Sequence, residues 1–275
     1  MALSILSSVS AMTAENALSS TQSNLTKTLN RLSTGLKINS GSDDAAGLSI
    51  SAGMSANIAA LTQSQQNASN AIGMLQTADG ALSQVSSLLN RAVTLATEAS
   101  TSGITSAQAT ALNTEYTSIQ NEINQIGTNT NFNGSDVFGT TNAAFISDGT
   151  STSDTTISTT IDALSATALG LTANDLTTTT GAQASLTALV GSSGAINTVA
   201  AARGNIGASI NRLTAANNVM ANQVTNLQSA NNGIENADIA KTVADMTQYD
   251  VLQSTGMSAL QQSNQAQQAI LKLVQ

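Results

Sequence analysis

Residues 31–51 read RLSTGLKINSGSDDAAGLSIS, a short polar break between two long heptad patterns of apolar residues. Before the break, leucines spaced seven, four, three and four residues apart line one face of a predicted helix: Leu18, Leu25, Leu29, Leu32 and Leu36. After it, a second heptad pattern runs from Met54 through Ile58 and Leu61 and continues to Leu82. One helix over residues 45–99 would be about 80 Å long at about 1.5 Å per residue. The stretch therefore predicts two long helices and a joint between them.

Two further heptad stripes predict that the rod folds back on itself. The first follows a turn-like break at residues 101–103 and ends at Gly127: Leu112, Tyr116, Ile119, Ile123 and Ile126. The second lies in the C-terminal half: Ile206, Ile210, Leu213, Met220, Val224, Leu227 and Ile234. Asn217 and Asn231 occupy two positions of this stripe, where amides either fix the register or sit at a hydrated seam.

The middle of the chain predicts a small β region. Asn133-Gly134 is a strong turn dipeptide, and residues 143–161 are rich in Thr and Ile around Asp148-Gly149, so we expect a short hairpin there. The stretch that follows, to Gly194, has weak periodicity and fits either partial helix or mobile surface. The predicted fold class is mainly α, a long antiparallel helical rod with terminal coiled-coil helices and a small β-hairpin region.

Each end of the chain carries an amphipathic helix whose partner is the other end or another copy. The C-terminal stripe is Ile239, Val243, Met246, Met257, Leu260, Leu271 and Val274. Helices so rich in Ser and Gln bury too little apolar surface to offset their ordering entropy, so we expect them to be mobile until assembly covers them. We assign polymerisation to ten residues of the two ends: Leu18, Leu25, Leu29, Leu32, Ile239, Val243, Met246, Leu260, Leu271 and Val274.

The composition favours long, thin packing and excludes most enzyme chemistry. Aromatic residues make up 2% of the 275 residues and charged residues 9%, and there is no Pro to break a helix. The chain has no Cys and no His, which removes thiol nucleophiles, imidazole bases and the commonest zinc ligands. We predict a protein that is not an enzyme and uses no cofactor.

The charge distribution argues against nucleic-acid and membrane partners. The net charge is −8, and no Lys or Arg lies between Arg91 and Arg203. An acidic middle opposes binding to nucleic acid or to anionic lipid. We expect no transmembrane helix, because no run of about 18 apolar residues occurs. The N-terminus has no basic flank, so a cleaved secretory signal is not predicted and export would need another route.

The acidic pair Asp43-Asp44 has two readings. Adjacent carboxylates before Ala45 favour capping of the helix that follows, and a metal site would need oxygen ligands from elsewhere in the chain. Gly35, Gly41 and Gly47 lie nearby without a Walker lysine or a Rossmann strand, which favours turns and close packing over a phosphate site.

Several separated blocks resemble bacterial flagellin and occur in the order of that family. They are residues 31–51, LLNRAVTLATEAS at 88–100, NTNFNG at 129–134, GASINRL at 207–213 and the long block at 232–274. Two places depart from the family pattern: Ser7-Ser8-Val9 stands where the family often has Asn-Thr-Asn, and Gln267 stands where it often has Pro.

The resemblance implies a division of the chain into a tube-forming part and an outer rod, as a short form without large variable domains. Residues 1–33 and 237–275 would be paired terminal helices of an inner tube, residues 34–46 a connecting segment, residues 47–133 and 176–236 the outer rod, and residues 134–175 the hairpin and a Ser/Thr-rich surface. The implied function is a secreted, extracellular subunit that polymerises into the flagellar filament for swimming. Implied partners are other copies, the flagellar export apparatus, a chaperone and a cap protein.

Some flagellins are also detected by an animal Toll-like receptor through a patch on the outer rod. The matching positions are Arg91, Leu95 and Glu115, and the first two lie four apart on one helix face. The alternative reading of Leu95 is a buried side chain between surface charges. Val93 replaces a charged residue that is common in the recognised flagellins.

Two other functions fit parts of the pattern. A hook-filament junction protein shares the terminal helices but usually departs from DDAAGLSIS at residues 43–51. A secreted coiled-coil adhesin or effector would carry its function in the middle region.

Overall fold

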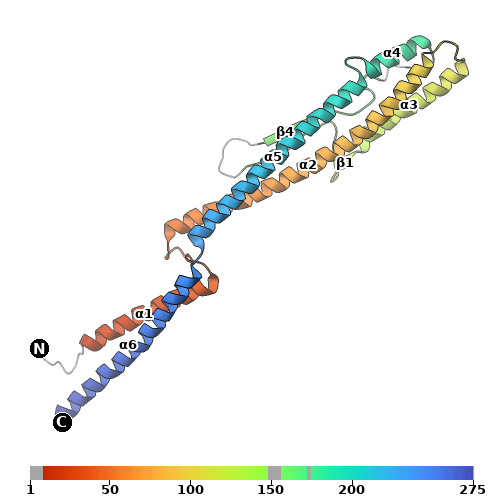
Figure 1. The fold of residues 1–275 in the computed structure, drawn as a ribbon. Helices are drawn as coiled ribbons and strands as arrows, with labels where there is room; N and C mark the ends of the chain where they lie inside the picture. Colours follow the sequence, from red (N-terminus) through yellow and green to blue (C-terminus); the bar gives the residue numbers. More distant parts are fainter. Residues whose placement is uncertain (1–8, 148–155, 172–174, 275) are drawn as a thin grey trace. The chain divides into compact units, whose positions relative to one another are not determined.

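The computed structural model describes residues 9–147, 156–171 and 175–274, without the side chains at positions 10, 267 and 270–274. Six helices lie in this part of the chain: α1 (Val9–Thr34), α2 (Ala45–Ala99), α3 (Ser106–Asn129), α4 (Thr179–Val190), α5 (Ala195–Glu235) and α6 (Ile239–Val274) (Figure 1). The predicted mainly α fold class is therefore confirmed, and the 55-residue α2 has the bounds that the heptad pattern predicted.

Two short antiparallel pairs form the β region. Strands β1 (Asn131–Phe132) and β2 (Ser135–Asp136) enclose Asn133 and Gly134, whose φ angles of 52° and 79° belong to the left-handed region that a tight hairpin turn requires. Strands β3 (Thr140–Phe145) and β4 (Thr156–Ile161) pair in register from Thr140↔Ile161 to Phe145↔Thr156. The expected hairpin is thus present as β3 and β4, and its predicted turn at Asp148-Gly149 lies outside the described residues.

One detail of the helices differs from the sequence prediction, and another decides between two of its readings. Leu36 was placed on the helical stripe of Leu18 and Leu32, but α1 ends at Thr34 and Leu36 forms an isolated antiparallel bridge with Asn236. Helix α4 lies in the stretch that fitted either partial helix or mobile surface, and its N-terminus is capped by the Thr178 hydroxyl, which accepts from the Gly181 amide. Its weak periodicity hid the helix because Ala, Ser and Thr occupy most of its positions.

The chain divides into two compact units. The terminal unit comprises residues 1–56 and 226–275, and the middle unit comprises residues 57–225. Helices α2 and α5 contribute residues to both. Each unit is described by itself below.

In the middle unit, the apolar faces of α2, α3 and α5 form the core. Figure 1 shows α3 and α5 alongside α2. Leu75, Val85 and Leu89 of α2 are fully buried, as are Ile123 of α3 and Leu213 of α5. Leu75, Ile123 and Leu213 belong to the stripes read from the sequence, so the heptad patterns identified the buried faces there. Val85 and Leu89 lie beyond the predicted α2 stripe, which ended at Leu82.

Side-chain amides on one face of α3 hold the segment that leads from β4 to α4. Asn124 Oδ1 accepts from the Ala166 amide at 2.8 Å, Gln120 Nε2 donates to the Leu171 carbonyl at 2.6 Å, and Asn113 Oδ1 accepts from the Leu176 amide at 2.9 Å. The segment therefore satisfies its backbone groups on a helix instead of a sheet. Gly127 lies one turn beyond Asn124 and directly faces the Leu164 carbonyl oxygen.

Helix α2 is long and apolar enough, by length and composition alone, to cross a membrane. Its most apolar 18-residue window has a mean hydropathy of 1.2, so the sequence argument from uninterrupted apolar runs was too strict. One such helix does not by itself indicate a membrane protein, because Ala-rich helices of packed bundles meet the same criteria.

Gly127 provides a test of this packing. A Cβ at position 127 would overlap the Leu164 carbonyl oxygen, so Gly127→Ala should lower the free energy of unfolding by about 1–3 kcal/mol. Gly80→Ala is the matched control, because no atom lies within 4 Å of its Cβ and alanine favours a helix by about 0.5–1 kcal/mol. Urea unfolding followed by circular dichroism measures both. Equal stability of the two variants would contradict the described contact.

Candidate functional site

The terminal unit contains an antiparallel helix pair, α1 with α6. Buried or half-buried residues recur along α1 at alternating spacings of three and four: Ala11, Ala14, Leu18, Thr21, Leu25, Thr28 and Leu32. A matching series runs along α6: Thr242, Met246, Tyr249, Gln253, Gly256, Leu260 and Ser263. Alternating spacings of this kind define a coiled-coil seam. We call these two series the seam.

The seam is narrow and partly polar. Gln253 Nε2 donates to Gln22 Oε1 across it at 2.5 Å. A Cβ on Gly256 would lie 3.3 Å from Leu18 Cδ1, so the absence of a side chain lets the leucine pack against the α6 backbone. Of the described seam residues, only Leu25, Thr28 and Thr242 are buried. The pair therefore leaves most of its surface uncovered.

The ten residues assigned to polymerisation separate into two groups. Leu18, Leu25, Leu32, Met246 and Leu260 lie in the seam within one chain. Leu29, Ile239 and Val243 point away from it, with 46%, 48% and 41% of their surface exposed. The predictions at Leu271 and Val274 fall on side chains outside the described part of the chain.

Large exposed apolar side chains concentrate in the terminal unit. Twelve are exposed among the described residues, and nine of them belong to this unit: Val9, Met12, Leu29, Ile50, Ile239, Val243, Val251, Leu252 and Met257. Single exposed apolar residues are ordinary, but nine large ones within one unit favour a role in interaction. We call these nine residues the outward apolar face. The sequence stripe missed Val251 and Leu252 because they do not share the heptad positions of Ile239 and Met246.

A two-stranded backbone contact joins the helices of the terminal unit. The Lys37 amide donates to the Glu235 carbonyl at 2.7 Å, and the Ala237 amide donates to the Gly35 carbonyl at 2.9 Å, on either side of the Leu36↔Asn236 bridge. We call this contact the joint. The break between α1 and α2 was predicted from residues 31–51. The matching break between α5 and α6, at residues 236–238, was predicted only as a boundary between two parts of the chain.

Each of the two chain segments of the joint is followed by a helix whose N-terminus is capped by an aspartate. Asp44 Oδ1 accepts from the Gly47 amide at 2.9 Å at the start of α2, and Asp238 Oδ1 accepts from the Lys241 amide at 3.1 Å at the start of α6. Capping is thus confirmed for Asp44. Asp43 instead bonds backward through Oδ2 to the Asn39 and Ser40 amides, which lowers the pKa of its carboxyl.

Two glycines fit the joint for different reasons. Gly35 has a φ of +74° directly after α1, a left-handed conformation that glycine adopts without strain. At Gly47, a Cβ would lie 2.7 Å from Ile38 Cδ1, so the glycine makes room for the buried Ile38 against the first turn of α2. The turn and close-packing interpretation is confirmed at these two positions.

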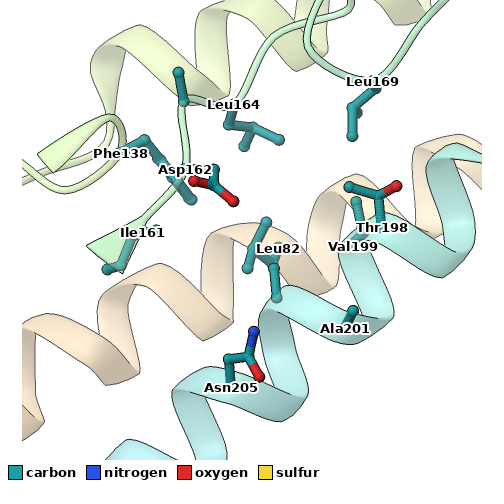
Figure 2. A pocket seen from close by; sticks show the side chains of 12 residues that line it. Leu82, Phe138, Ile161, Asp162, Leu164, Leu169, Thr198, Val199, Ala201 and Asn205 are labelled. Atoms are coloured by element: carbon teal, nitrogen blue, oxygen red, sulfur yellow. The ribbon is translucent and has the colours of Figure 1, made fainter. Parts of the chain in front are cut away.

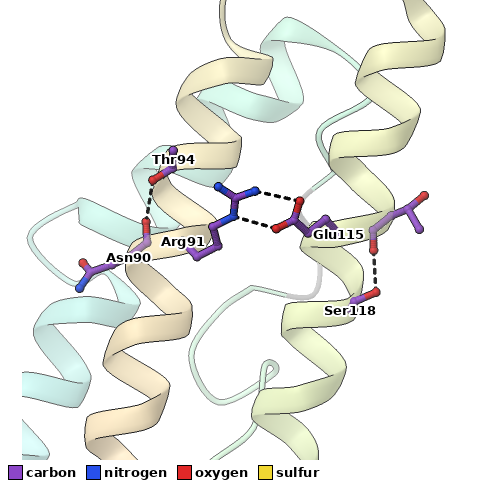
Figure 3. Close-up of polar contacts among 6 residues, drawn as sticks. Asn90, Arg91, Thr94, Glu115 and Ser118 are labelled. Carbon is purple, nitrogen blue, oxygen red and sulfur yellow. Dashed lines mark hydrogen bonds and ion pairs between the residues drawn. The ribbon is translucent and has the colours of Figure 1, made fainter.

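In the middle unit, the residues named for receptor contact lie on α2 and α3. Arg91 and Glu115 form a bidentate ion pair at 2.7 and 3.0 Å, and both side chains are about half exposed (Figure 3). The hydrogen bond from Arg91 lowers the pKa of Glu115. Leu95, one turn along α2, is fully buried. The structure therefore brings the two charges together and places the leucine in the core.

A cavity of about 290 Å³ in the middle unit lies between α2, α5 and the segment after β4 (Figure 2). Leu82, Phe138, Leu164 and Val199 form its apolar lining, and Asp162 supplies a single carboxylate. One carboxylate without a base or nucleophile beside it does not form a catalytic arrangement. Within the described ranges, no cluster of three acidic residues that could hold a metal ion is found.

The fold and the site define a helical structural protein with a paired set of terminal helices and an uncovered apolar face. The family model of the bacterial flagellin N-terminal helical region matches residues 5–143, and that of the C-terminal helical region matches residues 187–274. The chain therefore belongs to the bacterial flagellin family.

Relatives of similar length support the assignment. A flagellin of Halalkalibacterium halodurans is 33% identical over 250 residues, which cover 90% of this chain and 91% of the relative. A flagellin of Bacillus subtilis is 32% identical over 299 aligned residues, covering 97% and 98% of the two chains.

Among solved structures, the crystal structure of Bacillus cereus flagellin is 27% identical, with a TM-score of 0.45, and the match covers 60% of this chain and 94% of that one.

The ion pair between Arg91 and Glu115 predicts a pH dependence of stability. Because the pKa of Glu115 is lower in the folded chain than in the unfolded chain, its contribution is full above the ordinary value of about 4.3 and is lost as the pH falls through the folded value. Glu115→Gln should therefore be less stable than the parent at pH 7, and the difference should shrink toward pH 3.

Urea unfolding at both pH values measures this difference. Glu122→Gln on the same helix is the control, since Glu122 has no basic partner among the described residues. A Glu115→Gln deficit that is equally large at pH 3 would show that the ion pair is not its cause.

Proposed function

We propose that this chain is the structural subunit of the bacterial flagellar filament and that the outward apolar face of its terminal unit forms the contacts between copies. The proposal is supported most directly by the exposure of Leu29, Ile239 and Val243 beside a seam that already occupies the facing sides of α1 and α6. Membership of a structural family that builds an extracellular filament supports the same conclusion.

The mechanism is packing in two layers. The seam pairs the two ends of one chain, and the outward apolar face of one copy then packs against a different side of the terminal unit of the next copy. Burial on association contributes about 25 cal/mol for each Å² of apolar surface. A heterologous contact of this kind repeats without closing, which gives a helical polymer. Ordering of α1 and α6 would then accompany assembly.

Export through the flagellar secretion apparatus, with a chaperone and a cap protein, is part of the same proposal. It is supported by family membership. The hook-filament junction alternative is less favoured, because residues 43–51 read DDAAGLSIS and the matched relatives of similar length are flagellins. An adhesin or effector would not need the outward apolar face of the terminal unit.

Assembly can be tested with a charge on the outward apolar face. Val243→Asp should leave the monomer folded, since the side chain is exposed, but should bury an unpaired carboxylate in the polymer. The cost of about 3 kcal/mol raises the critical concentration about a hundredfold. Val219→Asp, an exposed valine of the middle unit, is the matched control and should polymerise like the parent.

Seeded elongation followed by light scattering and electron microscopy measures the critical concentration. If Val243→Asp elongates as well as Val219→Asp, the terminal unit does not provide the contact and the proposal fails.

We further propose that Arg91 and Glu115 form the surface an animal Toll-like receptor would meet. Their exposure supports a contact, whereas the burial of Leu95 assigns that residue to packing beneath them. Arg91→Ala should reduce receptor signalling by the purified monomer about tenfold, as removal of a central charged contact does.

A reporter cell line that carries the receptor measures signalling, with Arg212→Ala on exposed α5 surface as the control. Parent monomer that fails to activate cells responsive to another flagellin would exclude the receptor as a partner.

A further inference from the structure

A groove in the middle unit lies between α2 and the β region and has no role in the proposed filament contacts. Two adjoining hollows of about 790 and 320 Å³ share Asn70, Met74, Phe132 and Asn142 among their lining residues. Asn133 lines the larger hollow and Phe145 the smaller. Their volumes fall in the range of roughly 300–1,000 Å³ that small-molecule sites occupy. We call these six residues the amide groove.

The polar groups of the amide groove are neutral and can both donate and accept. The side-chain amides of Asn70, Asn133 and Asn142 each offer a carbonyl oxygen and two N–H donors. Asp136 is the single carboxylate in the lining, and neither hollow is lined by Lys or Arg. A phosphate or carboxylate ligand would therefore find no cation, whereas vicinal hydroxyl groups would find paired donors and acceptors.

Aromatic faces lie beside these amides. Phe132 packs on α2 over Gly73, where a Cβ would come within 3.4 Å of the ring, so the glycine seats the ring against the helix. Phe145 is 51% exposed on β3. The chain has only three Phe residues, and two of them line this groove. Rings next to amides suit a ligand with one C–H face and hydroxyl groups at its edge, which is the chemistry of a sugar.

The free edge of β3 argues against an extended peptide as the ligand. The Phe145 carbonyl accepts from Asn67, and the Ser147 amide and carbonyl both bond the Ser64 hydroxyl, so these two residues turn their backbone groups toward α2. Because the hydrogen-bonding direction alternates along an antiparallel strand, the backbone N–H and C=O groups of Thr141 and Ala143 point to the same edge of β3, the one not paired with β4. Two residues of open edge are too few for strand addition but add donors and acceptors for a small polar ligand.

We propose that the amide groove binds a short neutral saccharide. The sugar ring stacks on Phe145 and Phe132, and its hydroxyl groups bond the amides of Asn70 and Asn142. This site goes beyond the proposed filament function and does not depend on polymerisation.

Calorimetric titration of the full-length monomer with chitotriose, maltotriose and lactose tests the proposal, with sialyllactose as an anionic probe and tetrathreonine as a peptide probe. At least one neutral saccharide should bind with a Kd on the order of 1 mM. Phe145→Ala and Asn70→Ala should each weaken that binding about two- to tenfold, which is the effect of one lost aromatic or amide contact.

Both substituted residues are exposed, so the variants should keep the parent's thermal unfolding midpoint, which circular dichroism checks. Val190→Ala, an exposed apolar residue on α4, is the matched control and should bind like the parent. The proposal is overturned if no neutral saccharide binds at about 20 mM, about twentyfold above the expected Kd. It is equally overturned if neither variant weakens binding, or if sialyllactose or tetrathreonine binds more tightly than every neutral saccharide.

Discussion

The narrow seam between α1 and α6 is the constraint on which the rest of the terminal unit depends. Its small and polar residues, such as Gly256, Gln253 and Thr28, allow close approach of the two helices but bury little apolar surface. Fixing a residue's backbone costs about 1–2 kcal/mol, so a pair of long helices with so little burial is marginal alone. The apolar residues that the seam does not use face outward and remain available to other copies.

The joint links α1 and α6 to the parts of α2 and α5 that belong to the terminal unit. Backbone hydrogen bonds between Lys37 and Glu235 and between Ala237 and Gly35 hold the two chain segments side by side without requiring particular side chains. Asp44 and Asp238 then cap the N-termini of the helices that follow, α2 and α6. The middle unit gains its stability separately, from the buried faces of α2, α3 and α5 and from the ion pairs Arg91–Glu115 and Arg203–Asp79.

Sequence reasoning worked where one physical signal dominated. The heptad spacing and the absence of Pro predicted the bounds of α2, and Asn133-Gly134 predicted the tight turn between β1 and β2. It was less successful where small polar residues carry the packing. On α6 the apolar residues were read as one stripe, yet Ile239 and Val243 are exposed while Thr242 and Gly256 occupy the seam. Residue type alone cannot separate a face used within the chain from a face used between chains. The amide groove also required coordinates, because Asn70, Phe132 and Phe145 are distant in sequence.

Ordering of the terminal helices on assembly is tested most directly by hydrogen–deuterium exchange of monomer and seeded filament. Amides of α1 and α6 should exchange rapidly in the monomer and become strongly protected in the filament. Amides in the buried parts of α2, α3 and α5 in the middle unit should be protected in both states. Equal protection of α1 and α6 in monomer and filament would contradict the coupling of their folding to polymerisation.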